Sequence, residues 1–178
     1  MRYRQIKMVW PEDAKFGIVL SHDIDRVRKS YQYLTHFMRT GNAYHLKSIF
    51  SSGNPYWTFE KIMEVEEELD VKSTFFFLNE TMRLNPLKPK MYEVTLGRYH
   101  IEDDAIVDVV KAFDSKRWEI GVHGSYNSYK SADLLRTEKS VLEKIIGKKV
   151  RGIRQHFLNL EIPRTWELQK DAGFAYDS

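Results

Sequence analysis

Short apolar runs separated by longer amphipathic segments constrain the fold of this chain more than any other feature. The clearest run covers residues 72–78 and contains three consecutive phenylalanines. Similar runs occupy residues 16–20, 118–122 and 150–153, and a shorter one occupies residues 174–176. Continuous apolar strands of this kind are typical of a parallel sheet that is covered by helices on both sides. The pattern therefore predicts an α/β fold of about five parallel strands.

The segments between these runs have the apolar spacing of helices. Ser131 is a candidate N-cap and Gly147 a candidate stop for one of them, and Pro163 and Gly173 bracket another. Helices are expected over residues 27–39, 44–50, 59–69, 103–113, 131–147 and 164–171, with a turn at 51–55. The connections 26–54 and 80–102 are unusually long, which favours lids or substrate walls.

Composition narrows the class of protein. The chain has 178 residues, enough for one domain, with 42% hydrophobic and 30% charged residues, which excludes a disordered chain. It has no cysteine, which excludes disulfides, cysteine-ligated metals and thiol catalysis. The net charge of +3 is too small to indicate a nucleic-acid partner. No apolar run reaches the ~20 residues of a membrane span, and none follows the basic N-terminus as in a signal peptide, so we expect a cytoplasmic protein.

Polar side chains follow three of the predicted strands. They are Asp23 and Asp25 after the first, His123 and Asn127 after the third, and Arg154 and His156 after the fourth. Each motif alone has an ordinary explanation, since Asp-x-Asp is common in turns and a single histidine is usually a hydrogen-bonded rim residue. Because carboxyl ends of parallel strands meet at one edge of a sheet, their coincidence favours a shared site. Nitrogen and oxygen ligands of this kind suit a divalent cation.

These residues resemble the motifs of the polysaccharide deacetylases, the carbohydrate esterases with a NodB-type domain (carbohydrate esterase family 4). The segments that carry the resemblance are Leu20–Asp25, Val71–Phe77, Glu119–Asn127, Gly152–Phe157 and Ala172–Ser178, in the family's order. The resemblance spans residues 15–178. It implies a distorted (β/α) barrel, here incomplete. We therefore expect residues 1–178 to form a single catalytic domain that lacks its C-terminal strands.

The resemblance also implies roles for individual residues. Asp23 would be the general base, and Arg154 would pair with it. Asp25 and His123 would bind the metal, usually zinc, and the backbone amide of Phe157 would lie near the developing oxyanion.

The sequence departs from the family pattern at two points. Asn127 stands where the family has its second metal-binding histidine, and His156 or His22 are alternatives for that ligand. The Leu-x-His motif that supplies the family's general acid lies beyond the fifth strand in the family, and the sequence stops at Ser178 before that point.

Three functions remain open from the sequence. The first is a metal-dependent hydrolase that removes N-acetyl or O-acetyl groups from a sugar or polysaccharide. The second is a non-catalytic carbohydrate-binding domain derived from such an enzyme. The third, a phosphohydrolase with a His22–Asp23 metal doublet, ranks last because those domains are all-helical. An open sheet edge also predicts a longer polypeptide or a homo-oligomer.

Overall fold

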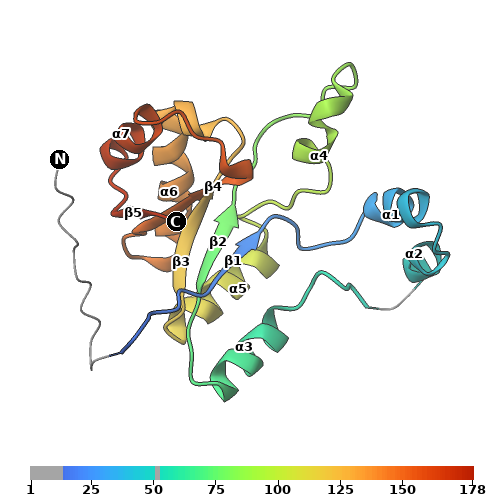
Figure 1. Cartoon of the computed structure of the whole chain (residues 1–178), viewed down its shortest axis with the longest axis horizontal. Helices are drawn as coiled ribbons and strands as arrows, with labels where there is room; N and C mark the ends of the chain where they lie inside the picture. The colour runs from blue at the N-terminus through green and yellow to red at the C-terminus, as the bar shows by residue number, and fades with distance from the viewer. Residues whose placement is uncertain (1–13, 51–52) are drawn as a thin grey trace.

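The computed structural model describes residues 14–50 and 53–178, in which five parallel strands form one sheet (Figure 1). The N-terminal residues 1–13 and the first half of the predicted turn at 51–55 lie outside the described residues. The strands follow one another across the sheet in chain order: β1 (Ser21–Ile24), β2 (Thr74–Leu78), β3 (Glu119–Gly124), β4 (Gly152–Gln155) and β5 (Tyr176–Asp177).

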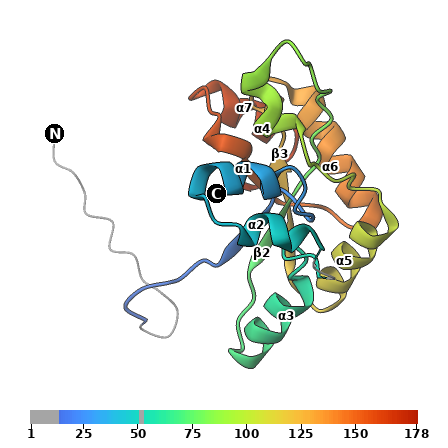
Figure 2. The ribbon, with the colours of Figure 1, turned by 90° about the vertical axis from the view of Figure 1, so that its right-hand side faces the viewer.

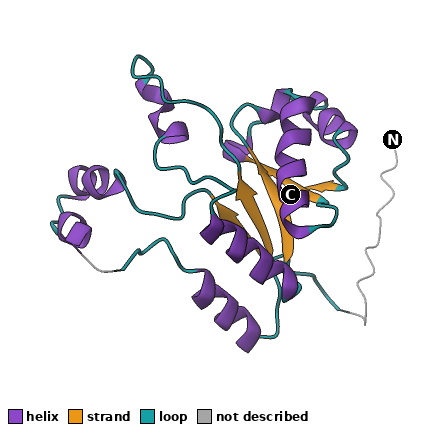
Figure 3. Ribbon diagram, turned by 180° about the vertical axis from the view of Figure 1, so that it is seen from behind, coloured by secondary structure: helices purple, strands orange, loops and turns teal. Residues whose placement is uncertain are grey.

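The chain order of the strands determines where the helices lie. Every crossover moves to the next strand in the same direction, and right-handed crossovers then leave their helices on one side of the sheet. We expected helices on both sides, and this expectation is wrong for the described crossovers. Helix α5 (Asp104–Ser115) lies behind the strands in Figure 1 and in front of them in Figure 3. Helices on one side are the arrangement of a (β/α) barrel, so the prediction of an incomplete barrel is confirmed.

The main hydrophobic core fills the space between the sheet and these helices. Phe75 of β2 stacks on Phe113 of α5 with ring centroids 3.9 Å apart, and Trp118 meets Phe113 edge-on. The same core receives side chains from α3 (Phe59–Glu68) and α6 (Ala132–Ile146). The amphipathic spacing seen in the sequence thus corresponds to real buried helix faces.

The opposite face of the sheet carries a different set of side chains, because neighbouring residues of a strand point to opposite sides. Asp23, Phe76 and Gly121 share one row across β1, β2 and β3. A side chain at Gly121 would meet the Phe76 ring, since its Cβ would lie 2.5 Å from that ring. Arg154 of β4 lies over the same ring, 4.7 Å from its centre.

The first strand lies further along the chain than predicted. Residues 16–20 are exposed, with Val19 84% accessible, and they precede the strand rather than form it. Only the carbonyl of Leu20 joins the ladder, where it accepts from the Thr74 amide. The sequence signal failed because an apolar run does not distinguish a buried strand from an extended segment beside an edge strand. Asp23 therefore lies inside β1, and Asp25 directly follows it.

The helix ends were predicted well where a cap residue marks them. The Ser131 hydroxyl accepts a hydrogen bond from the Leu134 amide at the start of α6, and Gly147 ends the helix with a φ of 70°. Helix α7 (Arg164–Asp171) begins directly after Pro163.

The long connections contain short helices. The first holds α1 (Gln32–Thr40), α2 (Tyr44–Lys47) and a 3-10 turn, η2 (Ser48–Phe50), and the second holds η3 (Pro89–Met91) and α4 (Tyr92–Thr95). Figure 2 shows α1 and α2 in front of the sheet when the molecule is viewed from that side. None of the described helices is long and apolar enough to cross a membrane.

Candidate metal centre

Three side chains at the carboxyl edge of the sheet come close enough to share one ion. Asp25 follows β1, His123 belongs to β3, and His156 begins the 3-10 turn η5 (His156–Leu158) directly after β4. Each offers one ligand atom, and these atoms all lie within 4.8 Å of one another. Asp25 Oδ1 is 3.2 Å from His123 Nε2 and 3.4 Å from His156 Nε2.

The hydrogen bond of His123 determines which of its nitrogens faces Asp25. Its Nδ1 lies 2.9 Å from the backbone carbonyl oxygen of Arg154, and a carbonyl only accepts, so Nδ1 carries the proton. In the neutral ring Nε2 then has a free lone pair, and it points at an oxygen that also carries lone pairs. A cation bound by this nitrogen and by Asp25 would use these lone pairs, and a carbonyl partner for the second nitrogen is typical of metal-binding histidines.

His156 is buried and is held in its neutral form. Burial is the main cause that lowers its pKa to about 4, with Arg98 and His123 adding to the effect and Asp25 opposing it. Its Nδ1 has no hydrogen-bond partner among the residues that the structure describes. A neutral imidazole is the form that ligates metals.

Asp25 stays ionised despite its partial burial. Burial opposes ionisation, but the contact with His123 and the nearby charges, including that of Arg98, outweigh it, so the pKa of Asp25 lies below its ordinary value. The Oδ1 atom accepts no hydrogen bond from the described part of the chain. A buried carboxylate oxygen without a donor, facing two imidazole nitrogens, fits a divalent ion.

Two consecutive residues of the second long connection hold the segment that carries Asp25. Arg98 donates from Nη1 to the backbone carbonyl of Asp25 at 3.0 Å, and its Nη2 lies 3.5 Å from His156 Nε2. The buried Tyr99 hydroxyl donates to the Ile24 carbonyl and accepts from the Leu78 amide, both at 2.8 Å. The connection of residues 80–102 therefore fixes the end of β1.

Asp23 and Arg154 form an ion pair beside the three metal-site residues. Arg154 Nη1 lies 2.8 Å from Asp23 Oδ1, and Arg154 also donates from Nε to the carbonyl of Ser178 and from Nη2 to its hydroxyl. Because His123 and Arg154 are register partners in β3 and β4, the pair lies next to the histidine.

Of the two histidines that are candidates for the remaining metal ligand, His156 lies beside Asp25 and His123, whereas His22 does not. His22 points to the helix-covered face, where it stacks on Phe75 and its Nε2 lies 2.8 Å from Glu66. Neighbouring side chains of a strand point to opposite sides of the sheet, so His22 points away from the side that carries Asp23. Asn127 lies three residues beyond β3, just before η4 (Ser128–Lys130), and its role as a ligand stays a prediction.

Phe157 has an uncommon backbone conformation in the turn that follows β4. Its φ is 58° and that of Leu158 is 52°, in the left-handed region that non-glycine residues seldom adopt. Such a residue costs about 1–3 kcal/mol and persists only where the surroundings hold it. The Phe157 ring packs on His156, with centroids 4.3 Å apart. Its role at the oxyanion remains a prediction.

Sequence reasoning missed Arg98 and Tyr99. They lie in a long polar connection where no periodic pattern marks a residue as important. The length of the connection was the only signal, since such loops often carry function.

Comparison with known proteins identifies the fold. No protein-family model matches the sequence, and neither does any curated protein. Among solved structures, a Mycobacterium smegmatis protein assigned to the polysaccharide deacetylases matches 96% of this chain and 53% of its own, with a TM-score of 0.57 and 14% identity. The chitin deacetylase of the fungal pathogen Colletotrichum lindemuthianum matches 90% of this chain and 54% of its own, with a TM-score of 0.52 and 12% identity.

The chain thus has the NodB-like fold of the polysaccharide deacetylases, as its motifs predicted. It spans about half the length of the two solved structures.

Proposed function

We propose that this chain carries the metal site of a hydrolase that removes an acetyl group from a sugar or polysaccharide, with an N-acetyl group as the preferred substrate. The observation that carries the proposal is the meeting of Asp25, His123 and His156 beside the Asp23–Arg154 ion pair. The fold it shares with polysaccharide deacetylases supports the same reaction class.

Asp25, His123 and His156 would hold the ion. Two imidazoles and one carboxylate are a donor set that zinc uses in hydrolytic enzymes, and we propose zinc as the metal. When bound, such an ion supplies Lewis acidity, and it lowers the pKa of water from 15.7 toward about 7.

Asp23 is the proposed general base. Its carboxylate takes a proton from the attacking water, and the ion pair with Arg154 holds that carboxylate in position. The turn at Phe157 would direct a backbone N–H toward the oxygen of the acyl group as negative charge develops there.

Acetate release from a panel of N- and O-acetylated sugars tests this proposal. With zinc added, the chain should release acetate from at least one N-acetylated sugar. Asp23→Asn should keep the metal but lower the rate by a factor of at least about 10² to 10⁴, because an amide cannot accept the proton.

The second candidate, a carbohydrate-binding domain without catalysis, gives a different result. It predicts sugar binding with no acetate release by the wild-type chain. Equal loss of metal in Asp23→Asn and Asp25→Ala would contradict the division of roles between the two carboxylates.

A further inference from the structure

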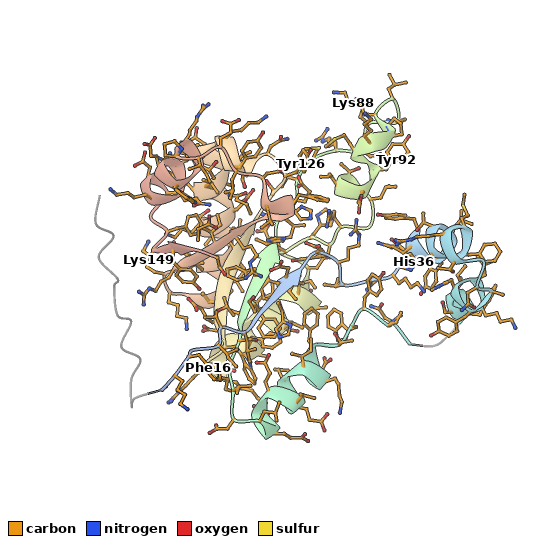
Figure 4. All side chains as sticks on the ribbon, viewed as in Figure 1. Phe16, His36, Lys88, Tyr92, Tyr126 and Lys149 are labelled. Atoms are coloured by element: carbon orange, nitrogen blue, oxygen red, sulfur yellow. The ribbon has the colours of Figure 1, made fainter. Side chains whose placement is uncertain are left out.

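A cavity of about 570 Å³ leads from the candidate metal centre toward α1. This volume lies within the roughly 300–1,000 Å³ typical of small-molecule sites. Asp23 and Asp25 line one end, and the other lining residues are Arg26, Tyr31, Gln32, Thr35, His36, Arg39, Tyr56 and Glu93. Figure 4 labels His36 on the side of α1 nearer the sheet. The site proposed above uses none of these additional residues.

Two arginines in this cavity lack acidic partners. Neither Arg26 nor Arg39 has a carboxylate within 4.0 Å among the described residues, whereas the surface residues Arg136 and Arg164 each pair with one. Arg26 donates from Nη2 to the Tyr31 hydroxyl at 3.0 Å and to the carbonyl of Glu93 at 2.5 Å. Its buried Nε has no hydrogen-bond partner in the described part of the chain. A buried donor without a partner needs an explanation, and a group bound in the adjacent cavity would supply one.

The charges of the cavity favour an anion once the neighbouring carboxylates are accounted for. Asp23 is paired with Arg154, and the charge of Asp25 is offset by the nearby Arg98 guanidinium, which helps to hold the pKa of Asp25 below its ordinary value. Of the carboxylates that line the cavity, this leaves the exposed Glu93 against two guanidinium groups. Taken with these paired neighbours, the lining of the cavity therefore carries net positive charge.

We propose that this cavity binds the oxyanion of an acidic acetylated sugar, a carboxylate or a phosphate, while the metal centre receives its acetyl group. Arg26 and Arg39 bind the oxyanion, because a guanidinium matches the geometry of both groups through paired N–H donors. Tyr31 and Tyr56 supply aromatic surface and hydroxyl groups along the sugar. This inference rests on the proposed function and specifies its substrate class.

Calorimetric titration of the metal-free chain tests binding independently of turnover. The probes are N-acetylmuramic acid for the carboxylate, N-acetylglucosamine 6-phosphate for the phosphate, and N-acetylglucosamine as the neutral sugar. At least one acidic sugar should bind about 10-fold or more tightly than the neutral one. The acidic sugar that does so identifies which oxyanion the cavity takes.

Substitution of the cavity arginines tests whether they cause the tighter binding of acidic sugars. Arg39→Gln should weaken the acidic sugar about 10-fold and leave the neutral sugar unchanged, and Arg26→Gln should act in the same direction. Arg136→Gln, an exposed arginine of α6, is the matched control and should have no effect. Equal affinities for acidic and neutral sugars, or equal losses in Arg39→Gln and Arg136→Gln, would overturn the inference.

The same probes separate this inference from the proposed function. Tight binding of an acidic sugar without acetate release on adding zinc would reject the hydrolase and keep the anion site. Acetate release that is as fast from the neutral sugar, and unaffected by Arg39→Gln, would reject the anion site and keep the hydrolase.

Discussion

Replacing Tyr99 by phenylalanine isolates the contribution of one hydroxyl group to the end of β1. The phenol is buried and bridges two strands, since it donates to the Ile24 carbonyl of β1 and accepts from the Leu78 amide of β2. Phenylalanine keeps the ring and creates no large cavity. The substitution therefore removes two hydrogen bonds and leaves both backbone groups without their partner.

The expected cost follows from these two groups. A buried polar group that loses its partner costs about 1–3 kcal/mol, so the loss of two partners in Tyr99→Phe should lower the free energy of unfolding by about 2–6 kcal/mol. Because Asp25 directly follows Ile24, zinc affinity should fall as well, while the chain keeps all three proposed ligands.

Urea unfolding followed by circular dichroism measures the effect. The urea concentration at the midpoint of unfolding should fall in Tyr99→Phe, whereas the slope of the free energy of unfolding against urea concentration should not change. Tyr44→Phe is the matched control, because Tyr44 is 63% exposed, and it should change stability by less than about 0.5 kcal/mol. An equally small change in Tyr99→Phe would refute the assignment of Tyr99 as the anchor of β1.

Two further predictions concern other positions near the site. Asn127→His should tighten zinc binding, since imidazole is a better zinc ligand than an amide, and an unchanged affinity in competition with a chelator would show that Asn127 is not a ligand. Burial is the main cause that raises the pKa of Glu138 from 4.5 to about 7. The protonated side chain therefore makes its full contribution to the free energy of unfolding below pH 4.5, and this contribution is lost as the pH rises through 7. Glu138→Gln should therefore stabilise the chain by about 2–3 kcal/mol at pH 8 and have little effect at pH 4, as measured by urea unfolding; equal effects at both pH values would contradict this assignment.

The sequence predicted most of the fold because its strands and helices have strong local signals. The apolar run of β2 and the caps of α6 at Ser131 and Gly147 are read from a few neighbouring residues. Residues 16–20 show the limit of such signals, since their burial depends on what packs against them. The side of the sheet that carries the helices depends on strand order, which no single segment encodes.

The candidate site was predictable where its residues follow strands and not where they come from a connection. Asp25, His123 and His156 each lie in or directly after a strand, so parallel strands bring them together. To choose between His22 and His156, one must know which side of the sheet His22 faces, and that side depends on the residue at which β1 begins. Arg98 reaches Asp25 across 73 positions of sequence, and no local pattern indicates that contact.

Titration of zinc into the chelator-stripped chain tests the central claim, that Asp25, His123 and His156 together bind one metal ion. The account predicts one zinc per chain, with affinity reduced by about 100-fold or more in Asp25→Ala and His156→Ala, since even groups that only support metal ligands contribute about 10–100-fold. His100→Ala, at an exposed histidine outside the three, should bind zinc as the wild type does. Unchanged affinity in His156→Ala, or the same loss in His100→Ala, would contradict the account.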